Sequence, residues 1–89
     1  MKEKIFEVSD RFFIKGRGTV VTGILQTDRV IKIGTPVVII RPDNSEIKSE
    51  IRGADFFTRS FTENRTVGIL IKDVAKEDVT IGSELFIEV

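Results

Sequence analysis

The chain contains neither cysteine nor histidine. Without cysteine there is no disulfide, no thiolate nucleophile and no zinc finger of the structural type. Without histidine the usual general base and metal ligand are missing, so most hydrolase chemistry is excluded. We therefore expect a protein that is not an enzyme, with no catalytic residue, no metal and no cofactor.

Net charge and long apolar runs are absent as well. The 14 basic and 14 acidic side chains cancel, so no global charge draws the chain toward nucleic acid. Nothing approaches the run of about 20 apolar residues that a membrane helix needs, and the charged start Met1-Lys2-Glu3-Lys4 precedes no signal core. These absences predict a cytoplasmic location, with no membrane partner and no DNA partner.

The run Gly16-Arg17-Gly18-Thr19-Val20-Val21-Thr22-Gly23 is the most distinctive motif. A dinucleotide fingerprint requires Gly-x-Gly-x-x-Gly followed by a helix, but the third glycine comes too late here. The β-branched residues after Gly18 favour a strand instead. A mononucleotide loop would need Lys-Ser or Lys-Thr after its last glycine, whereas Gly23 is followed by Ile24. The run therefore predicts a turn that enters a β-strand.

Alternation of apolar and polar residues covers most of the chain. Its 89 residues, 40% hydrophobic and 31% charged, are sufficient for a single small globular domain over residues 1–89. Apolar residues recur at every second position, as half-buried strands require. We expect about six strands, within residues 6–14, 18–27, 36–40, 46–52, 67–71 and 85–89, and one helical turn over residues 75–78.

Two of the expected strands have a face that is relevant to possible binding surfaces. In the first segment the apolar face is formed by the even positions Phe6, Val8, Phe12 and Ile14. Asp10 interrupts that face. In residues 46–52 charged side chains of alternating sign share one face, which favours a solvated surface over a binding site.

A short repeat occurs twice. Residues 31–39 (IKIGTPVVI) parallel residues 79–87 (VTIGSELFI), with glycine and apolar residues at matching places. Each copy predicts a turn whose glycine takes a positive φ before a new strand begins. Two copies so far apart cannot stack as a solenoid, so they indicate two similar corners of a barrel. Since no amphipathic helix is available as cover, we predict an all-β fold, a small closed six-stranded antiparallel β-barrel.

The segment 8–23 (VSDRFFIKGRGTVVTG) resembles the opening of the second domain of translation elongation factor Tu and related translational GTPases. Further matches follow in order at residues 31–34, 66–70 and 74–82, so the resemblance covers nearly the whole chain. It implies a β-barrel of the translation-factor domain 2 type, without the GTPase domain that precedes it in the family. In the family this barrel helps to cradle the aminoacylated 3′ end of transfer RNA and can face the small ribosomal subunit.

Carried over position by position, the resemblance implies a set of site residues. Asp10, Phe12 and Thr19 match positions that line the aminoacyl pocket, and Asp55 falls near the acidic position beside the terminal adenosine. A carboxylate accepts hydrogen bonds from a charged α-amino group, and an aromatic ring lines the space for a variable side chain. The alternatives to these binding roles are structural. In them Asp10 marks a β-bulge or bonds to a local backbone amide, Phe12 belongs to the core, and Thr19 is an ordinary strand residue.

The chain departs from the family at some of these positions. Ser9 stands where the family usually has glutamate, and Thr66 stands where it has asparagine. Thr66 stays in the predicted aminoacyl-end set, with altered contacts to the RNA. Arg17, Arg59 and Arg65 are the predicted contacts to RNA phosphate, with a solvated surface as the alternative.

Three functions can be ranked from these observations. The first is a noncatalytic translation-factor module that contributes part of a site for the aminoacylated 3′ end of tRNA, with aminoacyl-tRNA or the ribosome as partner. The second is a structural or protein-interaction module that kept the fold and lost RNA binding, with a GTPase domain in another chain as partner. An enzyme ranks third, because only carboxylate catalysis is left without histidine, cysteine or a P-loop.

Overall fold

The computed structural model describes residues 1–27, 29–58 and 65–89, with side chains for residues 1–27, 29–54 and 66–89. Within these ranges the elements are β1 (Lys2–Glu7), β2 (Asp10–Ile14), β3 (Gly18–Ile24), β4 (Pro36–Ile40), β5 (Glu46–Thr58), β6 (Arg65–Ile71), the 3₁₀-helix η1 (Lys76–Asp78) and β7 (Glu84–Glu88). All strand pairs are antiparallel. The all-β prediction is confirmed, and η1 is the expected helical turn. No helix in the described ranges has the length and apolar character needed to cross a membrane.

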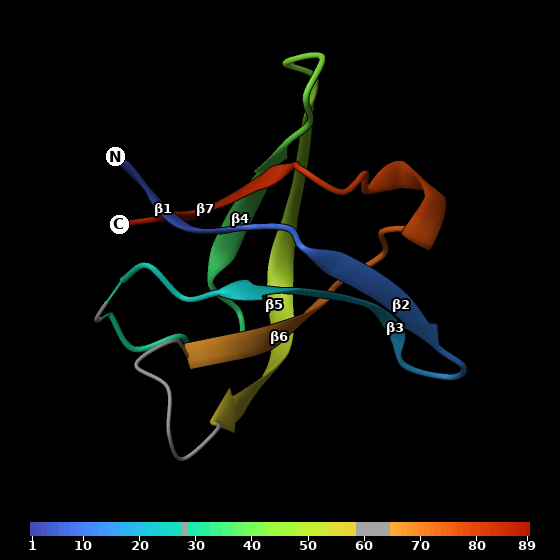
Figure 1. Ribbon diagram of the computed structural model, residues 1–89, viewed down its shortest axis with the longest axis horizontal. Helices are drawn as coiled ribbons and strands as arrows, with labels where there is room; N and C mark the ends of the chain where they lie inside the picture. The colour runs from blue at the N-terminus through green and yellow to red at the C-terminus, as the bar shows by residue number, and fades with distance from the viewer. Residues whose placement is uncertain (28, 59–64) are drawn as a thin grey trace.

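The strands form one curled sheet in the order β1-β7-β4-β5-β6-β3-β2 (Figure 1). β1 and β2 are its outer strands, and no ladder joins them within the described residues. The chain itself crosses from one edge to the other: Val8 N donates to Ser83 O at 2.7 Å beside β7, and Ser9 N donates to Thr22 O of β3 at 2.8 Å. The closed six-stranded barrel is therefore not confirmed, because this crossing divides the first expected strand into two edge strands.

The core lies inside the curled sheet and consists of aliphatic side chains and one phenylalanine. Its members are Ile5, Phe6, Val8, Val21, Val37, Ile39, Ile51, Val67, Ile69, Ile71, Val74, Val79, Leu85 and Ile87. Phe12 and Ile14, at 39% and 36% exposure, are outside it. The prediction that these two residues share a core face with Phe6 and Val8 is wrong, because the alternation restarts where the chain crosses between the sheet edges.

The two copies of the repeat form the same turn. Gly34 and Gly82 have φ values of 91° and 93°. In each copy the first residue of the turn accepts a hydrogen bond from the N–H of the fourth, at 3.2 Å between Lys32 and Thr35 and at 3.1 Å in the second copy. A positive φ at the third residue with this hydrogen bond is the pattern of a type II turn, which favours glycine. The predicted pair of matching turns is confirmed.

The first and last strands lie side by side (Figure 1). In their register Lys2 is opposite Glu88, and Val89 N donates to Met1 O at 2.8 Å. The two ends of the chain therefore meet at one edge of the sheet.

Candidate functional site

The ladder registers bring distant parts of the chain into one row on the sheet of β2, β3, β6 and β5. Asp10 pairs with Thr22, Thr22 pairs with Gly68, and Gly68 pairs with Asp55. Directly opposed residues of antiparallel strands share a face of the sheet. Positions 10 and 55, both predicted for the aminoacyl end, therefore belong to one row of the outer face.

Two further rows flank this one on the same face. On one side Phe12 pairs with Val20, Val20 with Leu70, and Leu70 with Gly53. On the other side the half-buried Thr66 pairs with Ile24. Because successive rows on one face are two residues apart, Asp10, Phe12, Asp55 and Thr66 all occupy positions on this face.

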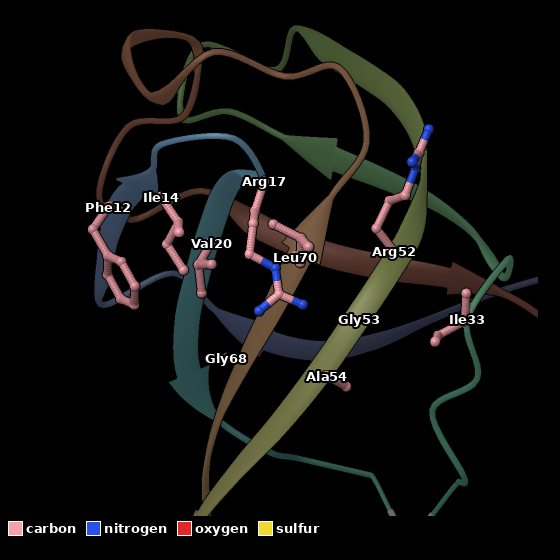
Figure 2. Close-up of a pocket in the computed structure, with 10 residues that line it drawn as sticks. All are labelled: Phe12, Ile14, Arg17, Val20, Ile33, Arg52, Gly53, Ala54, Gly68 and Leu70. Atoms are coloured by element: carbon pink, nitrogen blue, oxygen red, sulfur yellow. The ribbon is translucent and has the colours of Figure 1, made fainter.

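An apolar groove of about 340 Å³ lies over the second row (Figure 2). The lining residues are Phe12, Ile14, Arg17, Val20, Ile33, Arg52, Gly53, Ala54, Gly68 and Leu70. Gly53 and Gly68 carry no side chain and so leave room above the sheet. The volume falls within the range of about 300–1,000 Å³ that is usual for small-molecule sites.

Two arginine side chains border the groove. Arg17 comes from the turn between β2 and β3, and its guanidinium group lies over β6 (Figure 2). Arg52 lies on β5 at a β-bulge, where Ile51 still pairs with Ile71 but the next pair is Gly53 with Leu70. Arg52 is therefore the extra residue of the bulge, placed beside the floor of the groove.

Asp10 is exposed at the start of β2, and its carboxylate already makes a local contact. Oδ1 accepts a hydrogen bond from Arg11 N at 2.8 Å. This is the bond to a local backbone amide that was the structural alternative for Asp10. A carboxylate offers about four acceptor positions, so most of its capacity is still available to a ligand. Phe12, two residues further along β2, presents its half-exposed ring to the groove.

Thr19 lies on the opposite, inner face of β3. It is fully buried, and its Oγ1 donates to Val74 O. Its hydroxyl is thus engaged within the fold, away from the face that carries Asp10 and Phe12. The burial of Thr19 and its hydrogen bond to Val74 fit the structural alternative, in which Thr19 is an ordinary strand residue.

Replacing Thr19 with valine is expected to lower the free energy of unfolding by about 1–3 kcal/mol, because the buried carbonyl of Val74 loses its donor. Urea unfolding followed by circular dichroism would show a lower midpoint. Thr22→Val is the matched control, since its hydroxyl contacts Asp10 O at the surface; we expect a change within about 0.5 kcal/mol. Equal midpoints for the two variants would contradict a structural role for the Thr19 hydroxyl.

The other predicted residues are located only by the backbone or not at all. Asp55 pairs with Gly68, and Arg65 opens β6 opposite Thr58; the side chains of Asp55 and Arg65 lie outside the described part. Arg59 lies outside the described residues entirely.

Sequence reasoning missed most of the groove lining. It omitted Ile14, Val20, Leu70 and the bulge residues Arg52 and Gly53. A signal for the floor exists in the sequence: the runs at residues 20–21 and 69–71 are apolar on both faces of their strands. Strands that are apolar on both faces are covered on both sides in many folds, or carry a binding surface.

The described side chains around the groove form no acidic cluster that could bind a metal. Among the side chains described, no three acidic groups gather closely enough to hold a metal ion. Hydrogen bonds from Thr27 and Arg29 lower the pKa of Glu3, and hydrogen bonds from Ser45 lower the pKa of Asp43. Neither carboxyl lines the groove, which is defined by apolar surface and by arginine.

Fold and groove together define an all-β antiparallel module with an apolar, arginine-bordered surface on one face of its sheet. No family model matches the chain. In an alignment of 84 residues that covers 91% of the chain, the sequence is 33% identical to the apicoplast elongation factor Tu of Theileria parva. The chain spans 20% of the length of that protein. It is thus related to a domain-sized part of elongation factor Tu, in agreement with the resemblance seen in its motifs.

Proposed function

We propose that the chain is a noncatalytic translation-factor module whose groove receives the aminoacylated 3′ end of a transfer RNA. The observation that carries the proposal is the apolar groove beside the row that contains Asp10 and Asp55. Apolar and aromatic surfaces suit the stacking of a base, and carboxylates suit a charged amino group. Similarity to elongation factor Tu supports a role in translation.

Each part of the ligand has a matching surface. The terminal base packs on Val20 and Leu70, at the floor of the groove. The α-amino group is held by the exposed carboxylate of Asp10, which retains acceptor capacity. Phe12 is opposite Val20 and two residues from Asp10 on β2, and its ring offers apolar contact without a hydrogen-bonding group, so it accepts many aminoacyl side chains.

The groove is open on one side, and we propose that it forms half of a site. A GTPase domain, in another chain or elsewhere in a longer one, would supply the other half, so we expect this chain alone to bind weakly. Ribosome contact and a cytoplasmic location belong to the same proposal. A protein-interaction role is the second proposal, favoured by Val30, which is 77% exposed between β3 and β4 and does not line the groove.

A backbone-amide NMR titration tests the aminoacyl proposal. The ligand is a short acceptor-stem RNA with an amide-linked aminoacyl group, compared with the same RNA without that group. We expect shifts at Asp10, Phe12, Gly68 and Leu70 that require the aminoacyl group and persist at physiological salt. Shifts that do not depend on the aminoacyl group, or that salt abolishes, would contradict the proposal. Shifts at Val30 with an added GTPase domain, without shifts at Asp10, Phe12 and Leu70, would favour the second one.

A further inference from the structure

We propose that the carboxylate of Glu3 is a latch that closes the curled sheet, because it holds the segment that follows β3 (residues 25–27 and 29–35) against the outer edge of β1. The latch consists of Glu3 on β1 and of Thr27 and Arg29 beyond the end of β3. Within the described residues no ladder joins the two edge strands, so closure at this place depends on individual contacts. The latch acts within the fold and is independent of any ligand in the groove.

The first support is that one carboxylate binds two residues of this segment. Glu3 Oε2 accepts a hydrogen bond from Thr27 Oγ1, and Glu3 Oε1 accepts one from Arg29 Nε at 3.0 Å. Arg29 N in turn donates to Thr27 Oγ1 at 3.2 Å, so the two partners are also joined to each other. Hydrogen bonds to an ionised group are stronger than those between neutral groups, and both oxygens of this carboxylate accept one.

The second support is a β-bulge in β1 that leaves a backbone carbonyl for the same segment. The register with β7 shifts between Lys4 and Phe6, so Ile5 is the extra residue and is not paired with a residue of β7. Ile5 O instead accepts a hydrogen bond from Gln26 N at 2.7 Å. The segment is therefore bound to β1 by its backbone at residue 26 and by its side chains at residues 27 and 29.

The third support is that the neighbouring lysines of β1 are engaged elsewhere. Each lysine pairs with a glutamate on another strand, at 3.7 Å for Lys2 and 2.8 Å for Lys4. Among the described residues, Arg29 is therefore the cation that pairs with Glu3. Hydrogen bonds from Thr27 and Arg29 lower the pKa of Glu3, so the carboxylate is charged and the latch is closed at neutral pH.

The far end of the segment is held independently of Glu3. Gly34 N donates to Ile51 O at 2.7 Å, and Ile51 N donates to Thr35 O at 3.0 Å. Ile31 packs partly buried against the core. Loss of the latch is therefore expected to free the near end alone, as a local opening that leaves the rest of the fold intact. An open strand edge is a template for pairing with other chains, so the closed latch also protects the edge of β1.

Hydrogen exchange of the backbone amides in the full chain, followed by NMR at neutral pH, tests the latch. The Gln26 amide reports on the contact with β1, and the Gly34 amide reports on the far end of the segment. We expect Glu3→Ala to speed exchange at Gln26 about fivefold, a size typical of the loss of a partly exposed ion pair and its hydrogen bonds. Exchange at Gly34 should change by less than about twofold.

Glu84→Ala is the matched control. It removes the glutamate that pairs with Lys4, so β1 loses an ion pair on the side of β7 while the latch is kept. We expect exchange at Gln26 in this variant to stay within about twofold of the wild type. Arg29→Ala is a second test variant and is expected to speed exchange at Gln26 about threefold, since the hydrogen bond from Thr27 remains.

Unchanged exchange at Gln26 in Glu3→Ala would overturn the latch. Equal acceleration at Gln26 and Gly34 would also overturn it, because the loss would then be global. If Glu84→Ala has the same effect as Glu3→Ala, the effect reflects the ion pairs of β1 in general and the assignment to Glu3 is overturned. Amide spectra of each variant show whether the fold is retained; if Glu3→Ala does not fold, Arg29→Ala provides the same comparison.

Discussion

Replacing Gly23 with alanine is expected to remove a large part of the stability of the fold, because the added methyl group has no space. A Cβ atom at this position would lie 2.5 Å from Phe6 Cδ1 and 2.5 Å from Glu7 O. The first atom belongs to a fully buried ring, and the second belongs to the backbone of β1, so neither can move away easily. Overpacking costs about 1–3 kcal/mol and occasionally more, and we expect this variant at the upper end.

Urea unfolding of Gly23→Ala measures this loss against a total stability that for most domains is about 5–15 kcal/mol. Gly53→Ala is the matched control, since a Cβ there meets Leu70 Cβ at 3.7 Å, an ordinary contact. The control is expected to unfold near the wild-type midpoint. A Gly23→Ala midpoint equal to that of the control would mean that β1 and β3 are less closely packed than the structure has them.

Replacing Phe12 with alanine is expected to weaken binding of the aminoacylated RNA end about tenfold, since the ring buries apolar surface against the aminoacyl side chain and full burial of an apolar side chain is worth about 1.5–3 kcal/mol. The ring is 39% exposed and lines the groove, so its loss affects the ligand more than the core. The measurement is the same NMR titration, read as a dissociation constant.

Phe13 supplies the control for this prediction. It is the next residue on β2, is 58% exposed and does not line the groove. Phe13→Ala therefore removes an equal ring from the other face of the strand and should leave the dissociation constant within about twofold. Equal losses in the two variants would count against the groove as the binding surface.

Much of the fold was predictable from alternation and turn chemistry. The strand expected within residues 67–71 is confirmed, with Val67, Ile69 and Ile71 on its buried face, and so are the turns at Gly34 and Gly82. The division of the first strand was not predictable, because it depends on hydrogen bonds from residues 8 and 9 to two different strands. Such bonds follow from how the sheet curls, and a period of two within one segment contains no information about them.

β5 gives the clearest reason why the groove could not be derived from periodicity. Before the bulge the even positions from Glu46 to Glu50 face outward and the odd positions face the core. If this alternation continued along the strand, Asp55 would lie on the core face with Ile51. The bulge at Arg52 shifts the count by one, and position 55 enters the row with Gly68. The resemblance indicated Asp10, Phe12 and Asp55, but the groove floor and Arg52 depend on the register between β5 and β6.

The meeting of the two chain ends has a consequence for synthesis. β1 is made first, yet within the described sheet its ladder partner is β7, which is made last. A nascent chain can form the hairpins β2–β3 and β4–β5 early, but residues 2–7 must wait without their partner strand. Pairing between such distant segments is slow to form, since the whole intervening chain must first be ordered. We therefore expect folding on the ribosome to finish only after residues 84–88 have left the exit tunnel.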